Sequence, residues 1–298
     1  MLASAALALA SLLPAQPAAA PKFEIKDGDR IVWIGNTLVE REQRYGYWET
    51  ALHAAFPDKQ FTLRNLGWSG DTVHAEARGR FDFDKPDACL KQLVSLTLEL
   101  KPTVIFVSYG TNESFEGEEG LPKFEKGLEK LLDALKPANA RVVLFTPLPV
   151  EKSASLPDPT VRNKQLAAYQ KATQIVADNR GLMVADVFRE FSNIRHPGPL
   201  TENGVHLAPE GYRLYAASFV RLLNRSPALH WDRLEALRVA IIAKNELFFH
   251  RWRPQNETYL FGFRKHEQGK NGKEIAEFDP LVAKAEEEIE KIRKTLTK

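Results

Sequence analysis

Cysteine is almost absent from this sequence, which contains one, Cys89, in 298 residues. A single cysteine excludes an intramolecular disulfide and any metal cluster held by several thiolates. Its segment, PDACLKQLV, is typical of a helix with a buried face, so we expect an inert thiol. The seven histidines lack the spacing of a metal site. Neither a metal nor another cofactor is therefore expected.

The sequence also lacks an excess of charge of either sign. Lys and Arg total 41 against 39 for Asp and Glu, which gives a net charge of +2. This balance creates no long-range field that would attract nucleic acid or an anionic membrane. We therefore expect a small-molecule partner bound at a local site, and the oligomeric state stays open.

The apolar run at the start of the chain, Leu2 to Leu13, is too short for a membrane span of roughly 20 residues. Small residues follow it at positions 18–20, and together they resemble a secretory signal, residues 1–20, cut before Pro21. No Lys or Arg precedes the run, so an Ala-rich tail is the alternative. We expect export to a bacterial-type periplasm or out of the cell, without a stable membrane span after cleavage.

Short apolar segments alternate with longer amphipathic ones through most of the chain. Five segments rich in Val, Ile, Leu and Phe are predicted to be strands: 30–35, 60–67, 103–110, 141–149 and 181–187. Helical patterns lie near 43–56, 84–100, 121–137, 158–179 and 208–224. This alternation predicts an α/β fold, a three-layer α/β/α sandwich around a doubly wound, five-stranded parallel sheet.

The C-terminal quarter is of a different kind. A helix is predicted from about 227 to 249, followed by an aromatic and basic arm and by a terminal amphipathic helix. The expected domain is therefore residues 21–225, and residues 226–298 form an appendage.

Four loops carry glycine beside small polar residues at the points where ligands bind in such sheets. They read GNTL (35–38), NLGWSGDT (65–72), GTNE (110–113) and NGVH (203–206), the last continuing as HLAPEGY. In order and spacing these loops resemble the sequence blocks of the SGNH hydrolases, also called GDSL esterases and lipases. The resemblance covers roughly residues 30–224. It implies an SGNH/flavodoxin-like fold and hydrolysis of esters.

The resemblance also implies a role for each polar residue of the blocks. Thr37 takes the position of the nucleophile, and His206 takes that of the general base. The side-chain amide of Asn112 and the backbone N–H groups of Gly70 and Thr37 would form the oxyanion hole.

The first and the fourth block depart from the family pattern. Asn36-Thr37 stands where the family has Asp-Ser, and Asn203 replaces the Asp that orients the base. The threonine methyl crowds the approach to a carbonyl, and losing the Asp of a serine-type triad costs on the order of ten-thousandfold in rate. Glu113 or Glu202 could supply the missing negative charge, with Asn36 as a further supporting residue.

Two functions remain open on this evidence. The first is an ester hydrolase that removes an acyl group from a carbohydrate or a similar small substrate. The second is a binding module without catalysis. Activation of water by His206, without a covalent intermediate, is a possibility between the two.

The aromatic and polar residues Trp68, Arg253 and Asn256 are of the types that contact a sugar. Against this stands a packing role, in which the arm wraps the domain and buries Trp252, Tyr259 and Phe261.

Overall fold

The computed structural model describes residues 23–78, 85–152, 157–194, 196–267 and 271–296. The expected signal segment, residues 1–20, lies outside these ranges. Within them, no helix combines the length and the apolar character needed to cross a bilayer.

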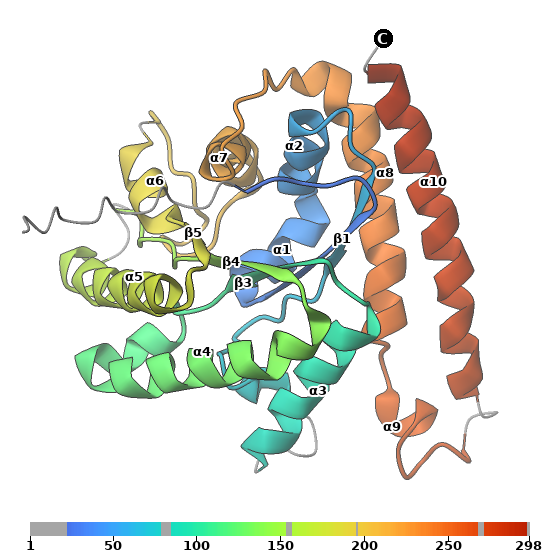
Figure 1. The fold of residues 1–298 in the computed structure, drawn as a ribbon, viewed down its shortest axis with the longest axis horizontal. Helices are drawn as coiled ribbons and strands as arrows, with labels where there is room; N and C mark the ends of the chain where they lie inside the picture. Colours follow the sequence, from blue (N-terminus) through green and yellow to red (C-terminus); the bar gives the residue numbers. More distant parts are fainter. Residues whose placement is uncertain (1–22, 79–84, 153–156, 195, 268–270, 297–298) are drawn as a thin grey trace, which may run out of the picture.

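Five parallel strands form one sheet in the order β2-β1-β3-β4-β5, which confirms the predicted fold class (Figure 1). The strands are β1 (Asp29–Gly35), β2 (Phe61–Asn65), β3 (Val104–Ser108), β4 (Arg141–Phe145) and β5 (Met183–Ala185). All five residues of β3 are buried, as a parallel sheet covered on both faces requires. The chain leaves β1 toward β2 on one side and later returns to β3 on the other. Ligands bind at such a switch point, outside the carboxyl ends of the strands.

Helices cover both faces of this sheet (Figure 1). One face packs against α1 (Thr37–Tyr45), α2 (Tyr47–Ala55), α6 (Val187–Asn193) and α7 (Pro209–Leu222). The other packs against α3 (Pro86–Glu99), α4 (Leu121–Leu135) and α5 (Thr160–Arg180). The 3₁₀ segments are η1 (Glu76–Arg78), η2 (Glu113–Gly120), η3 (Lys136–Ala138) and η4 (Asn271–Glu277). Cys89 is buried on α3, as expected.

The predicted helix at 43–56 is in fact two helices. Asn36 caps α1 directly after β1, because its Oδ1 accepts the Leu38 N–H at 3.2 Å. Gly46, at φ 64°, then ends α1 in the left-handed conformation that glycine adopts at little cost. Thr37 is therefore the first residue of a helix and lies just beyond the carboxyl end of β1, the strand next to the central one.

The appendage is mainly a pair of long helices, α8 (Trp231–Trp252) and α10 (Phe278–Leu296), joined through the short α9 (Glu257–Leu260) (Figure 1). Buried Lys244 of α8 bonds the Glu49 carboxylate at 2.7 Å and the Leu63 carbonyl of β2 at 2.9 Å. The helix pair thus covers the β2 edge of the sheet. Trp252 is buried, but Phe261 is 55% exposed, so the expected burial of Phe261 is wrong.

Candidate active site

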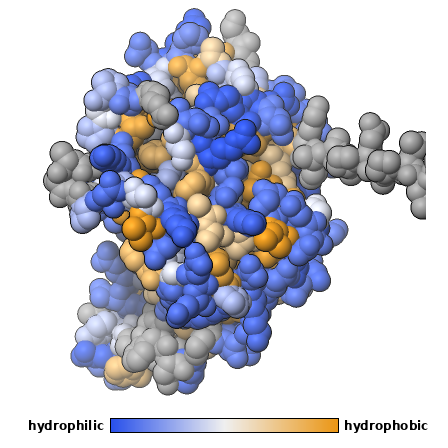
Figure 2. All heavy atoms as spheres, turned by 90° about the vertical axis from the view of Figure 1, so that its left-hand side faces the viewer, coloured by the Kyte–Doolittle hydropathy of each residue, from blue (hydrophilic) through white to orange (hydrophobic). Residues whose placement is uncertain are grey.

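A cleft opens at the carboxyl ends of β1 and β3. Its lining includes Thr37, Arg41, Asn112, Arg162 and His206, together with apolar side chains from the loop after β4. Figure 2 shows the side of the molecule toward which the strands run, where hydrophobic patches are interspersed with hydrophilic residues. Three of the four sequence blocks thus contribute side chains to one cleft, whereas the second block lies outside that lining and contacts Thr37 through the Gly70 N–H.

The first and second blocks meet at the Thr37 hydroxyl. Its Oγ1 accepts the Gly70 N–H at 3.1 Å. Gly70 has φ +77° and open space around its α-carbon, so the backbone conformation and not crowding calls for glycine here. A hydroxyl and a backbone donor of the types that acyl transfer uses are therefore in contact.

The third block is tied to the second. The Asn112 Nδ2 donates to the Asp71 carbonyl at 2.7 Å, which leaves the second N–H of the same amide for a ligand. Glu113 accepts the Val73 N–H at 2.8 Å and the Gly110 N–H at 2.9 Å, one with each carboxylate oxygen. Burial raises the pKa of Glu113 to about 7. Glu113 thus braces the two loops and forms no hydrogen bond with His206.

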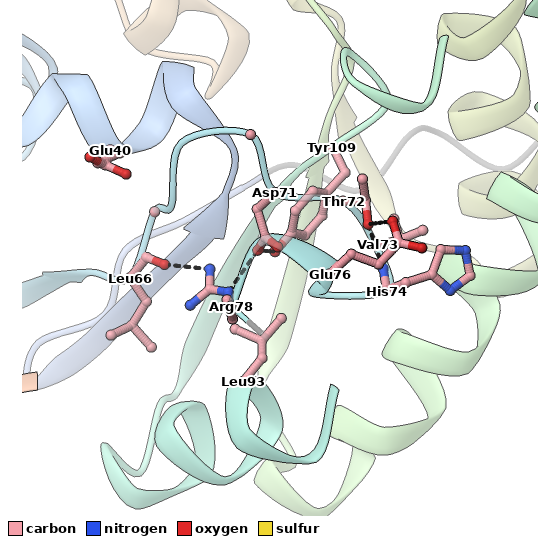
Figure 3. A network of polar contacts seen from close by, with 12 residues as sticks. Glu40, Leu66, Asp71, Thr72, Val73, His74, Glu76, Arg78, Leu93 and Tyr109 are labelled. Atoms are coloured by element: carbon pink, nitrogen blue, oxygen red, sulfur yellow. Dashed lines mark hydrogen bonds and ion pairs between the residues drawn. The ribbon is translucent and has the colours of Figure 1, made fainter. Parts of the chain in front are cut away.

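Beneath the Gly70 loop lies a buried polar network that the sequence did not reveal (Figure 3). Arg78 Nε donates to Asp71 Oδ2 at 2.7 Å, and Tyr109 donates to the same oxygen at 3.0 Å. A second Arg78 nitrogen donates to the Leu66 carbonyl at 2.7 Å. Burial raises the pKa of Asp71, whereas the Arg78 charge lowers it. This network holds the residue next to Gly70 in place.

The fourth block is a loop in which the Asn203 side chain binds backbone N–H groups of the two residues that precede and include His206. Oδ1 of Asn203 accepts the His206 N–H at 2.9 Å and the Val205 N–H at 3.2 Å. Nδ2 of Asn203 lies 3.0 Å from Nδ1 of His206. The pair has the arrangement of an Asp–His pair, with an amide in place of the carboxylate.

The Asn203 amide determines which nitrogen of His206 carries the proton. Because two backbone N–H groups fix Oδ1, the amide nitrogen must face the imidazole, and that nitrogen can only donate. Nδ1 of His206 therefore accepts, and the neutral ring carries its proton on Nε2. Burial lowers the pKa of His206, the Arg41 charge lowers it further and Glu202 raises it. The imidazole thus offers the cleft an N–H donor instead of a basic lone pair.

Glu202 does not replace the missing aspartate by direct contact. Its carboxylate pairs with Arg41 at 2.5 Å, and its backbone N–H donates to the His206 carbonyl at 2.8 Å. It acts on the imidazole only through its charge. Within the described residues, no hydrogen bond joins the His206 ring to Thr37.

The residues expected to contact a sugar lie elsewhere. The Arg253 guanidinium is 3.4 Å from the centre of the Trp68 ring and pairs with Glu40 at 3.1 Å. Asn256 precedes α9 with φ 59°. As far as the described part of the chain shows, none of Trp68, Arg253 and Asn256 lines the cleft. In the described part of the chain, no three His, Cys, Asp or Glu side chains are grouped so that they could hold a metal ion.

Comparisons with known proteins identify the family and the fold. The model of the GDSL-like Lipase/Acylhydrolase family matches residues 28–214. Similar solved structures include Axe2, an acetylxylan esterase from Geobacillus stearothermophilus, with 19% identity, a TM-score of 0.51, and coverage of 67% of this chain and 95% of that one. Another is LAE5, an alpha/beta hydrolase enzyme from the metagenome of Lake Arreo, Spain, with 20% identity, a TM-score of 0.52, and coverage of 67% and 97%. At these identities the likeness shows the fold. No curated protein shows significant similarity to the chain.

Proposed function

Because this chain belongs to the GDSL-like lipase/acylhydrolase family, we propose that it hydrolyses an ester with Thr37 as the nucleophile. The observation that carries the proposal is the contact of 3.1 Å between Thr37 Oγ1 and the Gly70 N–H, at a cleft that Asn112 and His206 also line. A nucleophile and the donors for an oxyanion are the parts that acyl transfer requires.

In the proposed reaction, Thr37 Oγ1 bonds to the carbonyl carbon while its proton passes to His206 Nε2. The carbonyl oxygen takes the electron pair of the C=O double bond and is stabilised by N–H groups of Gly70 and Asn112. Collapse of this intermediate releases the alcohol, which takes the proton from His206, and leaves an acyl group on Thr37. Water then attacks the acyl group by the same steps and restores the free hydroxyl.

The proton transfer to His206 limits this reaction. Nε2 can accept a proton only when Nδ1 carries one, and Nδ1–H requires an acceptor where Asn203 now presents Nδ2. Turning the amide would break the bonds from Oδ1 to Val205 and His206. An Asp-to-Asn change in a serine-type triad lowers the rate about ten-thousandfold through the same wrong tautomer. We therefore propose a slow hydrolase.

The proposed substrate is an acyl ester of a carbohydrate or of a similar small molecule. Two observations support it: the signal-like pattern of residues 1–20, from which we also propose export, and the fold shared with an acetylxylan esterase.

The tautomer of His206 favours a second candidate function, ligand binding without turnover. With protons on His206 Nε2 and Asn112 Nδ2, the cleft offers hydrogen-bond donors suited to carbonyl or carboxylate oxygens. The same tautomer argues against activation of water by His206, since Nε2–H cannot take a proton from water.

A panel of short-chain aryl esters and acetylated oligosaccharides distinguishes these functions, assayed with the chain lacking residues 1–20 and with its Thr37→Ala and His206→Ala variants. Loss of activity in both variants supports the proposed nucleophile. Activity that survives Thr37→Ala refutes it. No turnover in any form, combined with ligand-dependent thermal stabilisation, favours the binding function.

A further inference from the structure

The cleft carries more positive than negative charge. Two arginines line it, Arg41 and Arg162, and its described lining includes no carboxylate. Arg41 pairs with Glu202, which lies outside that lining and is 45% exposed at its side chain. Arg162 forms no ion pair with any residue that the structure describes. Charge that is partly withdrawn from water is costly unless an opposite charge accompanies it.

Neutral groups hold Arg162 in place. Near the start of α5, its Nη1 donates to the Ser114 carbonyl at 2.7 Å, and its Nη2 donates to the Thr111 carbonyl at 3.0 Å and to the Ser114 hydroxyl at 2.8 Å. The guanidinium carbon lies 3.8 Å from the centre of the Phe115 ring, whose residue is 68% exposed. Burial lowers the pKa of Arg162, and no carboxylate opposes that shift. The guanidinium is thus rigid, partly desolvated and not neutralised.

Both arginines also keep an unused donor. The Nε of Arg41 is buried without a hydrogen-bond partner. The bonds of Arg162 to described residues come from Nη1 and Nη2, so its Nε–H has no acceptor among them. A buried donor without a partner destabilises the folded chain. Arg41 Nε is the buried one of these two donors, and guanidinium N–H groups without a partner at one cleft suit an anionic oxygen.

We propose that the ligand of this cleft carries a carboxylate, which is bound by the guanidinium groups of Arg162 and Arg41. This inference rests on the proposed function in that the same cleft holds the ester. The carboxylate belongs either to the acyl group, as in a hemiester of a dicarboxylic acid, or to the alcohol, as in an acylated uronic acid. A neutral acetylated sugar would leave the Arg162 charge unmatched, since only Arg41 has a carboxylate partner.

A purely structural role for Arg162 makes a different prediction. If its contacts with Thr111 and Ser114 only brace the loop that carries Asn112, removing it weakens neutral and anionic ligands equally. Selectivity for charge, and its dependence on salt, separates the two roles.

The test measures binding by calorimetry to the Thr37→Ala variant, which lacks the proposed nucleophile. Monomethyl succinate is compared with dimethyl succinate for the acyl side, and glucuronate is compared with glucose for the alcohol side. We expect at least one anionic ligand to bind about tenfold more tightly than its neutral partner at low ionic strength, and this gap to shrink at high salt. The ligand pair that shows this difference in affinity identifies whether the acyl group or the alcohol carries the charge.

Substitutions show which residue causes this gap in affinity between the anionic and the neutral ligand. Arg162→Gln is expected to abolish it and Arg162→Lys to retain part of it. The control Arg233→Gln, at an exposed position on α8, removes the same charge away from the cleft and is expected to leave the gap intact. Equal binding within both pairs, or equal weakening of both members by Arg162→Gln, overturns the proposal. Charge-selective binding without any hydrolysis by the unmutated chain supports this inference and refutes the proposed hydrolysis alone.

Discussion

Asn203→Asp is the substitution with the largest expected effect on this site. It replaces Nδ2, which lies 3.0 Å from His206 Nδ1, by a carboxylate oxygen and leaves Oδ1 to accept the same two backbone N–H groups. The imidazole then gains an acceptor at Nδ1, so its proton moves there and Nε2 becomes available as a base. The expected gain in kcat/KM approaches the ten-thousandfold that the opposite change costs in a serine-type triad, about 5.4 kcal/mol in the activation barrier.

The assay is hydrolysis of a short-chain aryl ester over a range of pH. Catalysis needs the neutral imidazole, so the rate falls as the pH drops through the pKa of His206. That pKa is lowered in the unmutated chain by burial and by Arg41, and a neighbouring carboxylate raises it. The acid-side fall in rate should therefore begin at higher pH in Asn203→Asp than in the unmutated chain.

The matched control is Asn203→Ala, which removes the amide donor without supplying a carboxylate and should show no comparable gain. If Asn203→Asp folds normally and hydrolyses esters no faster than the unmutated chain, the argument from the tautomer is refuted.

Three further predictions concern the residues around the nucleophile. Thr37→Ser removes the methyl group that restricts the side chain, so kcat should rise roughly tenfold; an unchanged or lower kcat would contradict the assigned attack. Arg78→Leu leaves Asp71, which is 0% exposed, without its charge partner. Chemical denaturation should show a loss of about 3–5 kcal/mol, against at most about 1 kcal/mol for Arg213→Leu, which breaks an exposed pair. The folded-state pKa of Glu113 is raised from 4.5 to about 7, so the folded chain holds a proton that the unfolded chain has already released between those values. The stability that protonated Glu113 contributes is therefore full below the unfolded pKa and is lost as the pH rises to about 7. Glu113→Gln should remove this part of the pH dependence of unfolding. An identical pH profile in the variant would argue against this role of Glu113.

Periodicity and loop composition were enough to predict the sheet and the position of the cleft. The rule that loops at the carboxyl ends of parallel strands converge selected the loops, and the resemblance to the SGNH hydrolases singled out Thr37, Asn112 and His206 within them. The break at Gly46 was missed because the amphipathic pattern continues across it. The seven-residue helix α6 was missed because it spans too few turns to establish a period.

The remaining features depend on contacts between residues far apart in the chain. Nothing local marks Arg78 as the buried partner of Asp71. The place of Arg253 on Trp68 depends on how α8 packs. The tautomer of His206 depends on which atom of Asn203 the backbone binds, and a residue name alone does not contain that information.

The protonation state of the His206 ring is the property to measure first, by ¹H–¹⁵N NMR correlation on the chain lacking residues 1–20, with His206→Gln to assign the signal. We expect a proton on Nε2 of the neutral ring in the unmutated chain and on Nδ1 in Asn203→Asp. A neutral ring that carries its proton on Nδ1 in the unmutated chain would contradict this expectation, because His206 would then already be poised as a base.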